Sequence, residues 1–525
     1  MREWMMAIGL SLGMAVPAVA QGTGPYTFRM VAGRDTVASD VVTRAATQVD
    51  VDMIYKGGGQ HWHYTMTVAP DQRVTRITTA FYRLAAGDTV PFQSAVMDFV
   101  GDSVHVKISG NVERTEVHPT TAGAIPYINP SSAAIEQVLR RARAVGGTED
   151  TVTVPIFAVS GGQTIPVTVT WQGADSAVLK LAGVEMRAQV GPDGSLLGMT
   201  IPAQHATVTR LEGAHPLVTK KIDYGAPPDA PYTAEDVTVH TPEGLSLTGT
   251  LTLPKARAGK VPAVVTITGS GAEDRDERIP GLEGYRPFWQ IADTLARRGI
   301  ATLRLDDRGV NGSSTGPSNA TSADFANDIR AALAWLKTRP EIDGSRLGLV
   351  GHSEGGMIAP MVAETDPSLR GIVLMAGPAY TGRRIVEYQQ RDAVEHAPSL
   401  TPEERKQALE QAEKETRELA AKNAWLRFFM DYDPLETARK VRVPVLILQG
   451  ETDHQVTPEQ ADTLAATFRA GGDKDVTEIK FPDTDHLFLA DSSGLPSGYS
   501  ILESRSVRPE VLGKIADWLT AHLRK

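Results

Sequence analysis

One serine, with a glycine two residues before it and another two residues after it, lies in a motif typical of a catalytic nucleophile. Ser353 is the centre of Gly351-His352-Ser353-Glu354-Gly355, after the apolar run 347–350 and before an apolar segment that starts at Gly356. A sharp turn from a strand into a helix strains its central residue and leaves room only for glycine on either side. The turn also brings the hydroxyl close to a helix N-terminus, which stabilises developing negative charge. The motif predicts a nucleophilic Ser353; the alternative is a tight turn that only packs.

A serine hydroxyl becomes nucleophilic only beside a base, and the base needs an acid to orient it. In strand–serine–helix sites the acid and the histidine follow the serine in that chain order. Asp453 follows the apolar run 445–448, and His486 follows the run 477–481. Both residues come just after a strand, at the sheet edge where open α/β sheets bind ligands. We therefore predict that His486 is the base and that Asp453 orients it.

Other residues compete for these two roles. The chain contains 12 histidines. Of these, His352 is next to the nucleophile and is expected to point away, and His454 is next to the acid. Glu451 precedes Asp453 by two residues and is the alternative acid. Asp485, beside the predicted base, is expected to be a solvated loop carboxylate.

Acyl transfer also needs N–H groups that bind the oxyanion of the tetrahedral intermediate. The backbone N–H of Glu354 follows the nucleophile, and its side chain is incidental to that role. The second donor is expected in Thr268-Gly269-Ser270-Gly271, where the Ser270 N–H is favoured over that of Gly271. This loop could instead hold a phosphate, but it lacks the lysine of a P-loop and the third glycine of a dinucleotide fingerprint. We therefore predict no cofactor.

The segments that must position these residues alternate between short apolar runs and longer amphipathic stretches in residues 233–525. This alternation predicts a mostly parallel sheet with helices on both faces. The connection of about 70 residues between the runs that end at 375 and begin at 445 is longer than a simple crossover needs. The capping box Thr401-Pro402-Glu403-Glu404 predicts that this insertion is helical. Strands are expected at 236–239, 247–253, 263–268, 300–305, 347–350, 371–375, 445–448 and 477–481, and helices at 287–298, 323–338, 354–364, 458–470 and 509–523.

The part of the chain before this domain has a different pattern of apolar and polar residues. Residues 26–222 mostly alternate apolar and polar side chains with turn signals between them, which predicts an antiparallel β-rich domain over 21–222. One helix is expected at 132–145, started by a serine and ended by two glycines. The proline-dense stretch 223–232 is predicted to be a linker.

Residues 1–20 have the three parts of a secretory signal: a basic start, an uncharged run and small residues at Ala18 and Ala20. The alternative is a buried N-terminal helix. We expect cleavage after Ala20 and a periplasmic or extracellular protein. No later segment reaches about 18 uncharged apolar residues, so no membrane anchor is expected.

The composition excludes several classes of function. Lys+Arg 53 and Asp+Glu 63 give a formal net charge of −10 over 525 residues, which argues against nucleic acid as a partner. There is no cysteine, which excludes disulfides, thiolate metal sites and a cysteine nucleophile. The pair His61 and His63 shares one strand face, but no third metal ligand is evident nearby, so no metal is expected.

Together these stretches resemble the bacterial α/β-hydrolases of the esterase and serine aminopeptidase-like group. The matching stretches are 268–277, 305–309, 348–356, 429–434, 449–456 and the segment after His486. The resemblance implies an α/β-hydrolase fold and a carboxylic ester hydrolase with a helical cap at about 380–440. Related members cleave peptides or thioesters, so these stay alternatives. Asp307-Arg308-Gly309 is expected to be an ion-paired turn at the rim of the site.

The predicted partner is a small acyl ester, and self-association is possible. A different class of function is a binding protein, in which the β-rich domain recognises an envelope or polymer ligand and the hydrolase domain is silent. The sequence leaves open the natural substrate, its acyl-chain length, the preference for ester, amide or thioester, the role of the β-rich domain and the oligomeric state.

Overall fold

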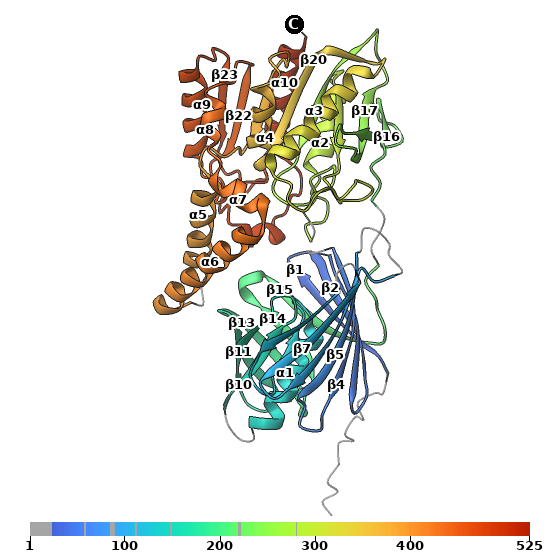
Figure 1. The fold of residues 1–525 in the computed structure, drawn as a ribbon, viewed down its shortest axis with the longest axis vertical. Helices are drawn as coiled ribbons and strands as arrows, with labels where there is room; N and C mark the ends of the chain where they lie inside the picture. The colour runs from blue at the N-terminus through green and yellow to red at the C-terminus, as the bar shows by residue number, and fades with distance from the viewer. Residues whose placement is uncertain are drawn as a thin grey trace, which may run out of the picture.

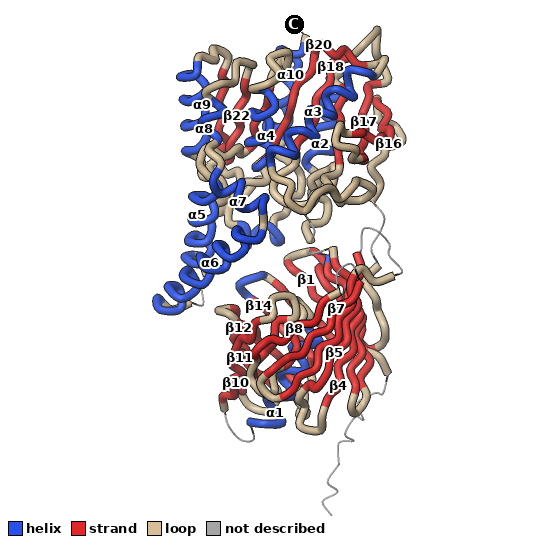
Figure 2. Tube along the Cα trace, in the orientation of Figure 1, coloured by secondary structure: helices blue, strands red, loops and turns tan. Residues whose placement is uncertain are grey.

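The computed structural model describes residues 24–56, 59–83, 90–110, 113–146, 150–218, 222–279, 281–397 and 400–524. The expected signal peptide, residues 1–20, lies outside the described residues. The chain forms two sheets, the first from its N-terminal part and the second from its C-terminal part (Figures 1 and 2). In these ranges no helix is both long enough and apolar enough to cross a membrane.

The first sheet has 15 strands among the described residues, and all neighbours are antiparallel except β9 and β10. Its order is β8-β7-β6-β5-β4-β3-β2-β1-β15-β14-β13-β12-β11-β10-β9. The antiparallel β-rich domain predicted from the period-two pattern is therefore confirmed. The strands are Tyr26–Ala32 (β1), Asp35–Arg44 (β2), Gln48–Tyr55 (β3), Gln60–Val68 (β4), Val74–Arg83 (β5), Gln93–Val100 (β6), Ser103–Gly110 (β7), Arg114–Pro119 (β8), Ile125–Tyr127 (β9), Thr151–Ala158 (β10), Gln163–Trp171 (β11), Ser176–Leu181 (β12), Val184–Val190 (β13), Leu196–Ile201 (β14) and Ala206–Glu212 (β15).

This sheet curls around one helix, Ser132–Gly146 (α1) (Figure 1). The helix contributes apolar side chains such as Val138 and Leu139 to the core that the strands form. It also buries Glu136, whose carboxylate accepts hydrogen bonds from the Tyr26 hydroxyl at 2.5 Å and from the guanidinium of Arg44 at 3.2 Å. A buried charge needs such partners, so these bonds fix how the helix sits inside the sheet.

The second sheet is mostly parallel, as its continuous apolar runs predict. Its order is β16-β17-β19-β18-β20-β21-β22-β23. The two pairs that contain β17 are antiparallel, and the other neighbours in this sheet are parallel. The strands are Tyr232–His240 (β16), Ser246–Pro254 (β17), Val261–Ile267 (β18), Ala301–Leu305 (β19), Ile342–His352 (β20), Ile372–Met375 (β21), Val445–Gly450 (β22) and Val476–Phe481 (β23).

Helices cover both faces of this sheet. Pro287–Ala296 (α2) and Pro509–Leu523 (α10) share one hydrophobic core with the strands, and Ser322–Thr338 (α3), Glu354–Ala363 (α4) and Glu459–Gly471 (α9) share the other. This three-layer arrangement is the α/β architecture that the alternating pattern predicts.

The long connection between β21 and β22 is helical, as expected from its capping box. It forms Gly382–Glu395 (α5), Pro402–Lys422 (α6), Ala424–Asp431 (α7) and Pro434–Ala438 (α8). The Thr401 hydroxyl accepts from the Glu404 N–H at 3.3 Å, and the Glu404 carboxylate accepts from the Thr401 N–H at 2.8 Å. Figure 1 shows α5, α6 and α7 on the side of the second sheet that faces the first sheet.

The two halves of the chain are in contact at several points. The Arg505 guanidinium lies 3.2 Å from the Asp35 carboxylate, and Lys56 forms an ion pair with Glu283. Gly183, in the turn between β12 and β13, lies so close to Leu400 that an added Cβ would be 2.5 Å from its methyl carbon. Leu400 precedes α6, so the β-rich domain contacts the cap.

The stretch 223–232, predicted as a linker, lies against the C-terminal domain. The Tyr224 hydroxyl donates to Asp274 at 3.2 Å, and the Arg275 guanidinium stacks 4.4 Å from the centre of the Tyr224 ring. The Arg286 guanidinium donates to the carbonyl of Asp223 at 2.8 Å. These contacts tie the start of the C-terminal domain to the loop that follows β18.

Candidate active site

The backbone at Ser353 is strained, as the turn between β20 and α4 requires. Its φ is 52° and its ψ is −118°. A Cβ at Gly351 would lie 2.1 Å from the carbonyl oxygen of Gly355, and a Cβ at Gly355 would lie 2.1 Å from that of Ile267. No side chain fits at either glycine, so strand, turn and helix are packed backbone against backbone. The close packing leaves Ser353 half-buried at the carboxyl edge of the sheet.

The structure joins Asp453 and His486 by a hydrogen bond. His486 Nδ1 lies 2.8 Å from Asp453 Oδ2. The other carboxylate oxygen accepts from the N–H groups of Gln455 at 2.7 Å and Val456 at 2.9 Å, and both side chains are almost fully buried. Glu451, the alternative acid, is exposed. The residue that orients His486 in this geometry is Asp453.

The His352 ring contacts the backbone of the loop that carries His486. Its Nε2 lies 2.8 Å from the carbonyl oxygen of His486, and its Nδ1 lies 2.9 Å from the Glu277 carboxylate. Burial lowers the pKa of His352, but the Glu277 carboxylate outweighs that effect and the pKa is raised above its ordinary value. Both ring nitrogens of His352 therefore have a hydrogen-bond partner. Sequence reasoning did not assign it this positioning role.

The loop after β18 lies beside Ser353. A Cβ at Gly269 would be 3.4 Å from the Ser353 Cβ, and the Gly269 N–H donates to Glu277 at 2.8 Å and to Glu273 at 3.1 Å. The next residue, Ser270, is exposed. Its N–H and that of Glu354 donate to no other group within the described part of the chain. Both predicted oxyanion donors are therefore available to a ligand.

The Glu354 side chain connects the nucleophile turn to the cap. Its buried carboxylate accepts from the Ser322 hydroxyl at 2.6 Å and from the Trp425 indole N–H at 2.9 Å. Burial raises the pKa of this carboxyl. Trp425 lies on α7 and stacks on Phe429, with ring centroids 5.6 Å apart. These side-chain hydrogen bonds are separate from the backbone N–H of Glu354, which is the group predicted to bind the oxyanion.

The Asp307-Arg308-Gly309 turn is ion-paired through Arg308, which lies 2.6 Å from Asp328. Asp307 has no ion pair with any residue in the described part of the chain. It is half-buried beside the loop that follows β18, where its carboxyl accepts from the Thr268 hydroxyl at 2.8 Å and the Glu273 N–H at 2.9 Å. Burial raises the pKa of Asp307 to about 8. Burial and the neighbouring Glu277 also raise the pKa of Glu273, so burial favours the protonated form of both carboxyls.

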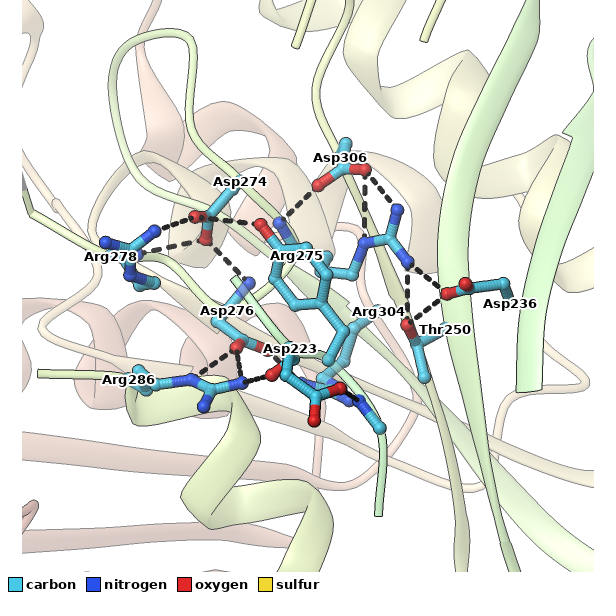
Figure 3. A network of polar contacts seen from close by, with 12 residues as sticks. Asp223, Asp236, Thr250, Asp274, Arg275, Asp276, Arg278, Arg286, Arg304 and Asp306 are labelled. Atoms are coloured by element: carbon cyan, nitrogen blue, oxygen red, sulfur yellow. Dashed lines mark hydrogen bonds and ion pairs between the residues drawn. The ribbon is translucent and has the colours of Figure 1, made fainter. Parts of the chain in front are cut away.

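Two buried aspartates anchor the loop that continues from the oxyanion residues (Figure 3). Asp306 at the end of β19 accepts from the Arg275 guanidinium at 2.6 Å and from the Arg275 N–H at 2.9 Å. Asp276 accepts from Arg286 at 2.7 Å and also pairs with the fully buried Arg304. The network ties Arg275, Asp276 and Arg286 to the neighbouring strand.

Asp485, expected to be solvated, is fully buried. One carboxylate oxygen accepts from the Leu489 N–H at 2.8 Å, and the other has no partner within the described residues. Burial raises the pKa of Asp485 to about 7. The segment 487–491 folds back against this carboxyl and buries it. The local sequence around His486 does not predict this burial.

Asp485→Asn is expected to remove part of the pH dependence of stability. Between its unfolded pKa near 4 and its folded pKa of about 7, the folded state keeps a proton that the unfolded state has lost. The wild-type free energy of unfolding therefore falls as pH rises through that range, by on the order of 3–4 kcal/mol. Asparagine does not titrate, so urea unfolding at about pH 4.5 and about pH 8 is expected to show a smaller fall.

The matched control is Asp483→Asn, two residues away and exposed. It is expected to follow the wild-type pH dependence. If Asp485→Asn also follows the wild type, Asp485 ionises in the folded protein as it does in water.

Comparison with known proteins agrees with this geometry. Residues 279–494 match the model of the alpha/beta hydrolase family, and the matched region contains Ser353, Asp453 and His486. The C-terminal domain has the α/β-hydrolase fold. Among the proteins that it is similar to are relatives named as an esterase and as a dipeptidyl aminopeptidase.

The relatives include Esterase EstD of Thermotoga maritima, which is 28% identical over 290 residues, 54% of this chain and 67% of that protein. Dipeptidyl aminopeptidase BIII of Pseudoxanthomonas mexicana is 25% identical over 430 residues, 76% of this chain and 58% of that protein. An esterase structure from Pyrococcus furiosus covers 57% of this chain and 96% of its own, with 17% identity and a TM-score of 0.40.

Proposed function

We propose that this α/β-hydrolase cleaves carboxylic esters through an acyl-enzyme on Ser353. The observation that carries the proposal is the buried Asp453–His486 pair, 2.8 Å apart, on the same sheet edge as a serine in strained backbone geometry. These are the three groups that nucleophilic acyl transfer requires. The N–H groups of Ser270 and Glu354 complete the proposed site as donors to the oxyanion.

In the proposed reaction, His486 Nε2 takes the Ser353 proton while Oγ bonds to the carbonyl carbon of the ester. The carbonyl oxygen gains negative charge and accepts from the Ser270 and Glu354 N–H groups. His486 then gives its proton to the leaving alkoxide as the C–O bond breaks, which releases an alcohol and leaves an acyl-serine. A water molecule gives a proton to His486 and its oxygen attacks the acyl carbon. Release of the acid returns the proton to Ser353.

The proposed substrates are esters of short to medium acyl chains. Apolar side chains of the cap support this proposal: the Trp425 ring stacks on Phe429, and its indole N–H donates to Glu354, the residue after Ser353. A relative named as an esterase agrees with this substrate class. A peptidase is the second candidate, since a relative named as a dipeptidyl aminopeptidase is similar over 76% of this chain.

Labelling with a fluorophosphonate probe tests the proposed nucleophile. The folded chain is expected to gain one covalent adduct, located on Ser353 by peptide mass spectrometry. A folded chain that stays unlabelled would favour the silent-scaffold binding protein instead.

Turnover of p-nitrophenyl acetate and butyrate, compared with aminoacyl p-nitroanilides and thioesters, tests the substrate class. Esters are expected to have the highest kcat/KM. A higher value for aminoacyl amides would replace the esterase proposal by a peptidase with the same nucleophile.

A further inference from the structure

A second group of chemically active side chains lies beside the triad but takes no part in it. Asp392 and His396 are on or just after the cap helix α5, and His454 is in the turn after β22. One potential ligand atom from each lies within 4.8 Å of the others. We propose that these three side chains bind a divalent transition-metal ion such as Zn²⁺.

The spacing fits a tetrahedral ion. His454 Nδ1 lies 3.0 Å from Asp392 Oδ1, and His396 Nδ1 lies 3.3 Å from the same oxygen. Ligand atoms around tetrahedral Zn²⁺ are separated by roughly 3.3 Å when the metal–ligand bonds are about 2.0–2.1 Å. The three side chains therefore need only small rotations to surround one ion. His396 Nδ1 also lies 2.9 Å from the Asp392 carbonyl, a bond that the ion would replace.

The donor set selects the class of ion. Two imidazoles and one carboxylate suit Zn²⁺ and its first-row neighbours, whereas Mg²⁺ and Ca²⁺ prefer oxygen ligands. Asp392 is buried, His454 is part-buried and His396 is exposed. The buried carboxylate supplies negative charge where it is little screened, and the exposed side leaves access for the ion and for water as a fourth ligand.

The proposed ion would join the cap to the turn that carries the acid. His454 directly follows Asp453, and the neighbouring Gln389 on α5 already donates to the carbonyl of Gln455 at 3.1 Å. A bound ion would replace the direct contact between His454 and Asp392, which already joins these two elements, by metal–ligand bonds. The earlier candidate pair differs, because His61 lies 2.6 Å from Asp52 while His63 lies 3.2 Å from another aspartate, Asp50.

Zn²⁺ titration of the full-length chain, followed by isothermal calorimetry, tests the proposal without any measurement of catalysis. One ion is expected per chain. His396→Ala/His454→Ala is expected to lower the Zn²⁺ affinity at least roughly 100-fold, because two of three ligands are lost. The control His61→Ala/His63→Ala is expected to keep the wild-type affinity.

A wild-type chain without a one-to-one Zn²⁺ isotherm would overturn the proposal, and so would an unchanged affinity in the double variant. His396→Ala alone, at an exposed position, is a second variant with little effect on folding, and it too is expected to weaken binding. Co²⁺ offers an independent readout, since a tetrahedral site gives intense visible absorption that His396→Ala would lower. A chain that binds Zn²⁺ but is not labelled by the fluorophosphonate probe would contradict the proposed esterase and leave the proposed metal site standing.

Discussion

Replacing Ser353 with alanine is expected to lower kcat/KM for p-nitrophenyl butyrate by roughly 10⁴-fold or more, because a catalytic triad acts as a unit. The size of the effect follows from the site geometry. His486, the proposed base, is already held by Asp453 at 2.8 Å, so the substitution removes only the proposed nucleophile. The measurement is steady-state hydrolysis at neutral pH, with far-UV circular dichroism to show that the variant is folded. Undiminished turnover would contradict the assignment of Ser353.

The same prediction extends to the acid and provides a matched control. Asp453→Asn is expected to cost about 10⁴-fold in kcat, because an amide N–H facing His486 holds the imidazole in the wrong tautomer. Glu451→Gln, at the exposed alternative acid, is expected to leave turnover within about twofold of the wild type. A large loss of turnover in Glu451→Gln together with a small one in Asp453→Asn would assign the acid role to Glu451. Combining Ser353→Ala with Asp453→Asn is expected to cost little more than Ser353→Ala alone.

Asp276→Asn is expected to destabilise the C-terminal domain by about 3–5 kcal/mol. Asp276 and Arg304 are both fully buried, and Asp276 also accepts from Arg286 at 2.7 Å. Removing the carboxylate charge leaves the Arg304 guanidinium buried without its counter-ion, which costs far more than the pair itself contributes. The measurement is the shift of the urea unfolding curve of the full chain relative to the wild type.

Two further variants separate charge burial from a general effect of the substitution. Asp517→Asn breaks the exposed pair with Arg298, 2.7 Å apart, and is expected to cost less than about 1 kcal/mol. Asp276→Leu/Arg304→Met removes both buried charges and is expected to be less destabilised than Asp276→Asn. If Asp276→Asn costs no more than Asp517→Asn, the buried network in Figure 3 contributes nothing beyond a surface pair.

Much of the C-terminal architecture is predictable from local pattern. Continuous apolar runs such as 445–448 indicate strands buried on both faces, and the observed strand is Val445–Gly450. The Thr401 capping box marks the start of a helix that begins at Pro402. The serine turn is recognisable because the glycines around Ser353 are required by contacts within a few residues or with the adjacent strand.

The sequence by itself determined the fold class, the order of the elements and three residues that follow strands at one sheet edge, because these depend on side-chain periodicity and turn chemistry. Only the tertiary structure decided which distant groups meet. Glu354 contacts Trp425 of the cap, and the His352 ring contacts the carbonyl oxygen of His486. The Asp485 carboxyl is buried away from solvent. Asp392 approaches His454 across 62 residues. Burial and pairing of this kind arise when separate elements pack together, and no local pattern encodes their distances.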